Sequence, residues 1–199
     1  MLYRKSSATG AGLSYLVHFC MDTKSQVALG VQARQAHTAS EWETGERLLE
    51  EAREPLGDRM KVVSADKGHG VGRFLEAVVR RGLKPHIPVH GQARERAEPL
   101  VATPRRVVSL EAARRARQRV AQVRARSRAV RAMGSRSYAI SRKLRLRIEH
   151  LIGDAKDCHG LRRARDRGVD KVNHQAVMTA VVMNLNNCPG GRYAARPAR

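Results

Sequence analysis

The stretch KVVSADKGHGVGRFLEAVVRRGLKPHIPVH, residues 61–90, decides the fold class of this chain. Its first six residues, 61–66, form a short β-branched run that ends in a carboxylate. Residues 74–82, FLEAVVRRG, are typical of a helix that ends at a glycine. Residues 84–90 predict a further strand with prolines at its margins. Strand, helix and strand in this order indicate an α/β layer with some parallel pairing.

The residues before this stretch extend the same pattern. Residues 13–22 and 26–33 are short apolar runs separated by polar residues, which predicts a β-hairpin. Residues 41–53 carry apolar side chains at helical spacing among many acids and predict an amphipathic helix. We therefore expect residues 13–90 to form an α/β core, preceded by a disordered segment 1–12.

The net charge is the outlier of the composition. The 199 residues contain 39 Lys and Arg against 18 Asp and Glu, a formal net charge of +21. Such a charge favours a polyanionic partner, because cations that neutralise phosphates release condensed counterions. Binding of an acidic small-molecule substrate would not need so large a positive charge. Arginine is well suited to bidentate phosphate contacts, although an Arg-rich genome explains the high arginine content equally well.

The charge is concentrated in the second half of the chain. Residues 105–145 contain 14 Arg and Lys and a single acid, Glu111, which gives this segment a net charge of +13. The basic segment 91–140 is either a helix with a thin apolar stripe or a solvated arm that orders on DNA, and both alternatives stay open. Its candidate DNA contacts are Arg114, Arg115, Arg117 and Arg119.

Helical periodicity returns after Ser141. One clean apolar stripe is formed by Leu144, Ile148, Leu151, Ile152 and Ala155. A further apolar stretch, residues 172–185, predicts a packing helix. We therefore expect two helices within residues 141–187, followed by a frayed tail over 188–199.

The chain carries no sign of secretion, membrane insertion or a zinc site. Cys20, Cys158 and Cys188 are odd in number and far apart, so we expect reduced thiols. No apolar run approaches the roughly 20 residues that cross a bilayer. These features predict a soluble, cytoplasmic protein without a membrane partner.

Two carboxylates, Asp66 and Glu149, lie at positions that suit ligand binding or catalysis. Asp66 follows a predicted strand and precedes a glycine-rich turn, a place where ligand-binding groups collect in α/β sheets. Glu149 lies between Arg145, one helical turn earlier, and Lys156, two turns later. Taken alone, Asp66 is more simply a turn or helix-cap residue, and Glu149 is more simply a member of an i,i+4 ion pair.

Taken together, the sequence segments around these carboxylates resemble those of the DDE transposases of bacterial insertion sequences. In VVSADKGHG, Asp66 matches the second catalytic Asp of that family, and His69 stands where the family usually has Tyr. In RLRIEHLIGDAKDCHGLRRARDRGVDKV, residues Arg145, Glu149 and Lys156 match the signature R-x-x-x-E-x-x-x-x-x-x-K.

Other positions resemble the family less closely. Arg142 replaces the Tyr that often lies three residues before the signature Arg. Residues 15–22, YLVHFCMD, are similar to the family's Y-x-x-H-x-x-x-D strand, which belongs to a structural hairpin more often than to the active site.

The resemblance implies an α/β fold of RNase H-like type, a mixed sheet flanked by helices. It implies metal-dependent phosphoryl transfer on double-stranded DNA, both transposon ends and target, with Asp66 and Glu149 as catalytic residues that bind Mg²⁺ or Mn²⁺. The cations placed to contact phosphates are Lys67, Arg142, Arg145 and Lys156. Transposases of this kind commonly act as dimers, so a homodimer is consistent with the resemblance.

The first catalytic Asp of the family has no match before Asp22, the first acid in the sequence. We therefore expect a truncated copy that lacks the first strand and has impaired activity. Asp22 precedes Thr23 and is kept as a weaker candidate for the metal site, although it aligns with the second strand. A non-catalytic, basic DNA-binding protein is the alternative, because it explains the charge without requiring either carboxylate.

Overall fold

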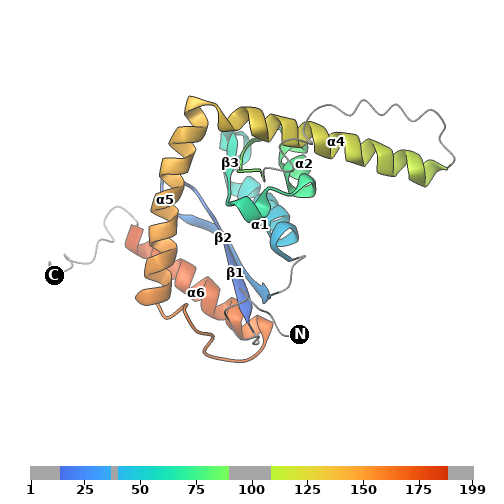
Figure 1. Cartoon of the computed structure of the whole chain (residues 1–199). Coiled ribbons are helices and arrows are strands. Elements are labelled where there is room, and N and C mark those ends of the chain that lie inside the picture. The colour runs from blue at the N-terminus through green and yellow to red at the C-terminus, as the bar shows by residue number, and fades with distance from the viewer. Residues whose placement is uncertain (1–13, 37–39, 90–108, 188–199) are drawn as a thin grey trace, which may run out of the picture. The chain divides into compact units, whose positions relative to one another are not determined.

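The computed structural model describes residues 14–36, 40–89 and 109–187, which form a mixed α/β structure (Figure 1). The predicted N-terminal segment 1–12 and the tail 188–199 lie outside the described residues. The chain divides into two compact units. Unit 1 comprises Met1–Pro55 and Leu144–Arg199, and unit 2 comprises Leu56–Lys143.

Unit 1 is built on the predicted hairpin. Strand β1 (Tyr15–Met21) pairs with strand β2 (Ala28–Gln35) in antiparallel register, which confirms the hairpin prediction. The register shifts between Cys20 and Met21, as expected for a β-bulge next to a turn.

Helix α6 (Val169–Asn187) packs along β2. Its buried side includes Val172, Ala176, Ala180 and Met183, at helical spacing. The predicted apolar helix is therefore present, but only one side of it is buried. Its other side leaves five large apolar residues at least 37% exposed: Val177, Met178, Val181, Val182 and Leu185.

Helix α1 (Ser40–Leu56) matches the predicted amphipathic helix and buries Leu48, Leu49 and Ala52. A Cβ atom on Gly30 of β2 would lie 3.0 Å from Leu48 Cδ2, so the helix and the hairpin pack closely at this point. Burial, with a further contribution from the Glu51 carboxylate, raises the pKa of the Cys20 thiol to about 11. Neither Cys20 nor Cys158 forms a disulfide, and Cys188 lies outside the described residues.

Unit 2 contains the stretch that decides the fold class. Strands β3 (Val62–Ser64) and β4 (Lys84–His86) pair in parallel, and helix α2 (Gly72–Arg80) connects them. Two short 3-10 helices, Gly57–Arg59 and Lys67–His69, precede and follow β3. The predicted parallel pairing is confirmed.

The core of unit 2 is small and tightly packed. Leu75 and Val78 of α2 and Ile87, just after β4, are completely buried. Burial of such side chains stabilises a fold by about 1.5–3 kcal/mol each. The strand–helix–strand unit is therefore held by the apolar side of α2.

Helix α4 (Leu110–Met133) is capped at its N-terminus by Ser109, whose hydroxyl accepts a hydrogen bond from Ala112 N at 3.2 Å. Of the segment 91–140, which the sequence leaves open between a helix and a solvated arm, the part Leu110–Met133 thus forms a helix, and residues 91–108 lie outside the described residues. This helix contacts α2 and β4 and buries Ala125 and Ala129. Small side chains suit this contact because they allow close helix packing.

Helix α5 (Arg136–Asp157) follows after a short turn, and the boundary between the two units falls inside it. The α/β class is confirmed, with two two-stranded sheets, β1–β2 and β3–β4, in the described residues. None of the helices in this part of the chain is long and apolar enough to cross a bilayer.

Candidate metal and DNA site

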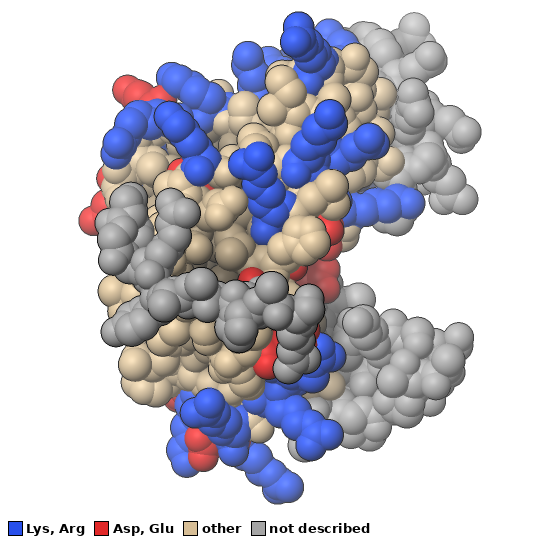
Figure 2. Space-filling model, turned by 90° about the vertical axis from the view of Figure 1, so that its left-hand side faces the viewer, with Lys and Arg blue, Asp and Glu red and all other residues tan. Residues whose placement is uncertain are grey.

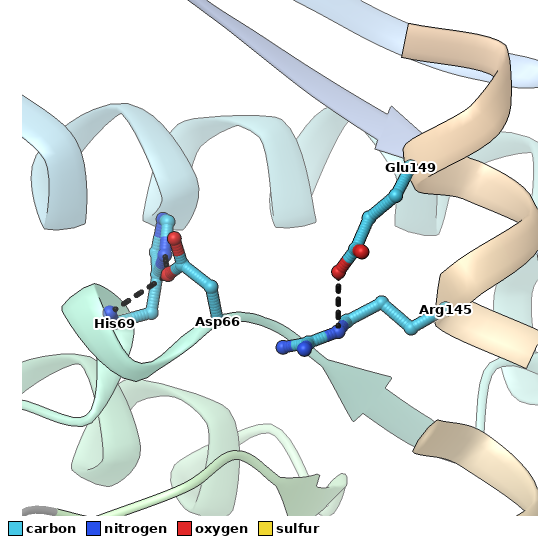
Figure 3. A network of polar contacts seen from close by, with 4 residues as sticks. All are labelled: Asp66, His69, Arg145 and Glu149. Carbon is cyan, nitrogen blue, oxygen red and sulfur yellow. Dashed lines mark hydrogen bonds and ion pairs between the residues drawn. The ribbon is translucent and has the colours of Figure 1, made fainter. Parts of the chain in front are cut away.

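Asp66 lies directly after β3, at the N-cap of the short 3-10 helix Lys67–His69. Its Oδ1 accepts a hydrogen bond from His69 N at 3.3 Å and lies 2.7 Å from His69 Nδ1 (Figure 3). The His69 ring in turn packs edge-on against Phe74, with centroids 5.2 Å apart. The Asp66 side chain remains 69% exposed, so the loop holds a carboxylate that a ligand can reach.

The backbone of this loop depends on one glycine. Gly70 is buried, and a Cβ atom there would lie 2.4 Å from the carbonyl oxygen of Pro88. No side chain can be accommodated against a backbone atom at that distance. Gly70 is therefore required by the close approach of the chain that follows β4.

Glu149 projects from α5 and forms an ion pair with Arg145, with Oε1 and Nε 3.3 Å apart (Figure 3). Its side chain is 54% exposed, whereas that of Arg145 is only 26% exposed. Arg142 and Lys156 are exposed, seven residues before and after Glu149. These spacings put all four side chains within about 60° of one another around the helix.

Asp22 stabilises the turn between β1 and β2. Its Oδ2 accepts hydrogen bonds from Ser25 N at 2.8 Å and from Ser25 Oγ at 2.6 Å, and its backbone closes the turn through Val27 O and Gln26 N. Burial by itself raises the pKa of Asp22, but the Ser25 hydrogen bonds and the Lys24 charge outweigh burial and hold the pKa below its ordinary value. The geometry is that of a hairpin turn.

The four candidate DNA contacts of the basic segment, Arg114, Arg115, Arg117 and Arg119, are all exposed on α4. Arg115 forms an i,i+4 ion pair with Glu111, with Nη2 and Oε2 3.3 Å apart. Lys67 is exposed beside Asp66. Every predicted phosphate contact outside Arg145 thus has an exposed side chain.

The donor chemistry of Asp66 and Glu149 fits a hard divalent cation. Both offer exposed carboxylate oxygens, the ligands that Mg²⁺ and Mn²⁺ prefer. An ion bound by either carboxylate would compete with His69 for the Asp66 oxygen or with Arg145 for the Glu149 oxygen. Among residues 14–36, 40–89 and 109–187, no group of three or more His, Cys, Asp and Glu side chains forms a ready-made metal cluster.

Sequence reasoning missed Gln175 of α6, which holds the arginine-rich loop after α5. Its Nε2 donates hydrogen bonds to Gly160 O and Arg163 O, both at 3.0 Å, and its Oε1 accepts one from Arg165 N at 3.0 Å. The hydroxyl of Tyr15 accepts a further bond from Gly168 N at 2.9 Å. One glutamine thereby fixes a loop whose arginines are exposed to solvent.

Two asparagines of α6 were also missed. Asn184 bonds both the N–H and the carbonyl of Ala28, at 2.7 and 2.9 Å, and Asn173 Oδ1 accepts a bond from Ala33 N at 2.8 Å. They satisfy backbone groups of β2 that β1 does not reach. Their spacing of eleven residues on an apolar helix places both on one side and was the available signal.

A buried histidine in unit 2 was left without a function by the sequence. His86 is 3% exposed, and its Nδ1 lies 2.7 Å from Ser141 Oγ. Its ring packs edge-on against Tyr138. Burial, together with the charge of Lys84, holds the pKa of His86 below its ordinary value. These contacts tie β4 to the first turns of α5.

Comparison with known proteins gives one family. The family described as Transposase DDE domain matches residues 5–185, which is most of the chain. Neither the curated proteins nor the solved structures include a match to this sequence. The extent of the family match, over both the Asp66 loop and the Glu149 helix, shows that the chain belongs to the Transposase DDE domain family.

Proposed function

We propose that Asp66 and Glu149 are metal-binding catalytic carboxylates of a transposase domain that cleaves and joins double-stranded DNA. The observation that carries this proposal is the cationic face of α5, where Glu149 stands between Arg142, Arg145 and Lys156 with its carboxylate exposed. The i,i+4 ion pair accounts for Arg145 alone, whereas a site for phosphates and a divalent ion accounts for Arg142 and Lys156 on the same side of α5 as well.

The roles follow from charge and exposure. Bound Mg²⁺ or Mn²⁺ would supply activation of the attacking oxygen and stabilisation of the leaving oxygen. Arg142, Lys156 and Lys67 are available to bind DNA phosphates, because their side chains are exposed. Arg145 neutralises Glu149 through the ion pair, and would be placed to contact a phosphate if a cation took its place beside that carboxylate.

An RNase H-like sheet is part of the proposal. Its support is the combination of an antiparallel pair, β1–β2, with a parallel pair joined by a crossover helix, β3–α2–β4. A two-stranded sheet is marginal on its own, so both pairs would gain stability from further strand pairing. We expect the domain to act on DNA in the cytoplasm and as a homodimer on paired ends, as the family resemblance suggests.

Strand cleavage by this chain alone is proposed to be impaired. The carboxylate of Asp22, the weaker third candidate, is used by the hairpin turn. Two carboxylates remain where the family resemblance implies three. The chain should therefore bind metal and DNA but cleave weakly.

Metal binding tests the two carboxylates directly. Titration of the full chain with Mn²⁺, followed by electron paramagnetic resonance, should show at least about tenfold weaker binding in Asp66→Asn and in Glu149→Gln. The matched control is Glu51→Gln, because Glu51 forms the same i,i+4 ion pair with Arg47 at 3.2 Å and is 46% exposed. Equal affinity in all four proteins would refute the proposal.

Nicking of supercoiled DNA tests the activity. The purified chain with Mg²⁺ should show little cleavage. Robust cleavage that Glu149→Gln abolishes would overturn the impaired activity and would support the role of Glu149. DNA affinity that is indifferent to divalent metal, together with unchanged Mn²⁺ binding in both variants, would favour the non-catalytic DNA-binding alternative.

A further inference from the structure

The arginines of α4 are not spread evenly around the helix. Arg117, Arg124, Arg128 and Arg131 follow one another at i, i+7, i+11 and i+14, and all four are exposed. In an α-helix these positions fall within about 60° of one another. They form a straight row, which we call the arginine row, about 21 Å long at 1.5 Å per residue.

The packing of α4 inside unit 2 explains why this side faces solvent. The buried positions Ala125 and Ala129 point toward the rest of the unit. Arg126 also points inward, because a Cβ atom on Gly72 of α2 would lie 2.7 Å from its Nη2. The arginine row occupies the part of the helix circumference turned away from these contacts.

The other exposed arginines of α4 lie elsewhere on the circumference. Arg115 and Arg119 precede Arg126 by eleven and seven residues, so they project from the same side of the helix as Arg126. Arg115 and Arg119 are exposed, whereas the same side of α4 is buried closer to its C-terminus, at Ala125 and Ala129. The sequence places Arg115, Arg117 and Arg119 in one basic segment, but the helix separates Arg117 from the other two.

The arginine row has no acidic partner among the residues that the structure describes. In the described part of the chain none of its four guanidinium groups forms an ion pair, whereas Arg115 pairs with Glu111. Four parallel cations repel one another, and only an anion with repeated charges relieves all four at once. Figure 2 shows one face of the molecule, on which Lys and Arg are abundant and Asp and Glu sparse.

We propose that the arginine row, Arg117, Arg124, Arg128 and Arg131, binds the phosphate backbone of double-stranded DNA. About 21 Å of duplex carries roughly twelve phosphates, so a row of this length has several phosphates within reach. Arginine favours this role because its planar guanidinium bonds phosphate oxygens in pairs. This proposal depends on the proposed function in one respect only, the choice of duplex DNA as the partner.

The experiment compares two double variants with the same loss of charge. Arg117→Gln/Arg124→Gln removes two members of the row, and Arg59→Gln/Arg80→Gln removes two exposed arginines of unit 2 that lie outside α4 and are not candidate DNA contacts. Glutamine keeps a helix propensity close to that of arginine, and circular dichroism checks that α4 is retained. Affinity for a duplex of random sequence is measured against salt concentration in EDTA, which removes any contribution of the metal-binding carboxylates.

The row variant should lower the slope of log affinity against log salt by about 2, since each phosphate contact contributes about 0.9. The control variant should change the slope by less than half of that. A row variant with Lys in place of Gln should keep the slope, because it keeps the charge. Equal slope losses in the two double variants would overturn the proposal, as would tighter binding of single-stranded RNA than of duplex DNA.

Discussion

Asp66 and Glu149 are both exposed carboxylates beside a nitrogen cation or imidazole, yet the protein positions them in different ways. Asp66 lies on a loop whose backbone is held by the close approach of Gly70 to Pro88 O. Glu149 lies within the 22-residue helix α5 and needs only the helix and Arg145. Long-range packing therefore positions the first carboxylate, and local periodicity positions the second.

The largest effect should come from the loop around Asp66. Gly70→Ala places a Cβ atom 2.4 Å from Pro88 O and should destabilise unit 2 by about 3 kcal/mol, because a backbone atom must move. Urea unfolding of the full chain measures this loss.

The matched change in α5 should have the opposite sign. Gly153 lies inside the helix, and a Cβ atom added there would meet nothing within 4 Å, so Gly153→Ala should stabilise the protein by up to about 1 kcal/mol. The same urea titration measures the gain. If both glycines respond alike, the contrast between the Asp66 loop and the Glu149 helix is wrong.

An effect smaller than that of Gly70→Ala is expected in the loop that follows α5. Gln175→Ala removes three hydrogen bonds to backbone groups of Gly160, Arg163 and Arg165 and should cost about 1–3 kcal/mol. Amide hydrogen exchange at Arg165 should accelerate, while exchange within α5 stays unchanged. Gln175→Glu keeps the acceptor for Arg165 N and should protect that amide better than Ala does. Equal exchange in the two variants would show that the bond to Arg165 N contributes nothing.

The smallest effect concerns pH and unit 2. The folded-state pKa of His86 is lowered by burial and by Lys84, so the unfolded chain binds a proton more readily than the folded one. Stability is therefore fully present above about pH 6.5 and falls as the pH drops from there toward the lower pKa of the folded state. Urea unfolding at neutral and at mildly acidic pH should show this loss in the natural chain and less of it in His86→Gln. An equal loss in both proteins would assign the pH dependence to other groups.

Much of the secondary structure follows from local patterns. The hairpin, the helix that becomes α2 and the apolar stripe of α5 were predictable because hydrophobic periodicity reports directly on backbone geometry. The spacing of Arg145, Glu149 and Lys156 was equally readable, since one helix carries all three. The family match over residues 5–185 agrees with the motifs that led to the transposase resemblance.

Contacts between distant residues could not be read in this way. Gln175 reaches back to a loop ten to fifteen residues earlier, and Asn184 bonds Ala28 across 156 positions. No periodic signal marks Gln175, and the only signal for Asn184 is its spacing of eleven residues from Asn173, which does not reveal the backbone group that it satisfies. Asp22 illustrates the converse, because its D-T pair suggests a metal ligand until the Ser25 hydrogen bonds are seen.

The sequence by itself determined the α/β class, the excess positive charge and the helix that carries Glu149, because each depends on composition or on neighbours within a few turns. Only the tertiary structure decided which side of α4 faces solvent, why Gly70 must lack a side chain and how Asp66 is held by His69. Those features depend on which surfaces pack together. The net charge of +21 indicated a polyanion, and the burial of Ala125 and Ala129 selected the row of arginines that can meet it.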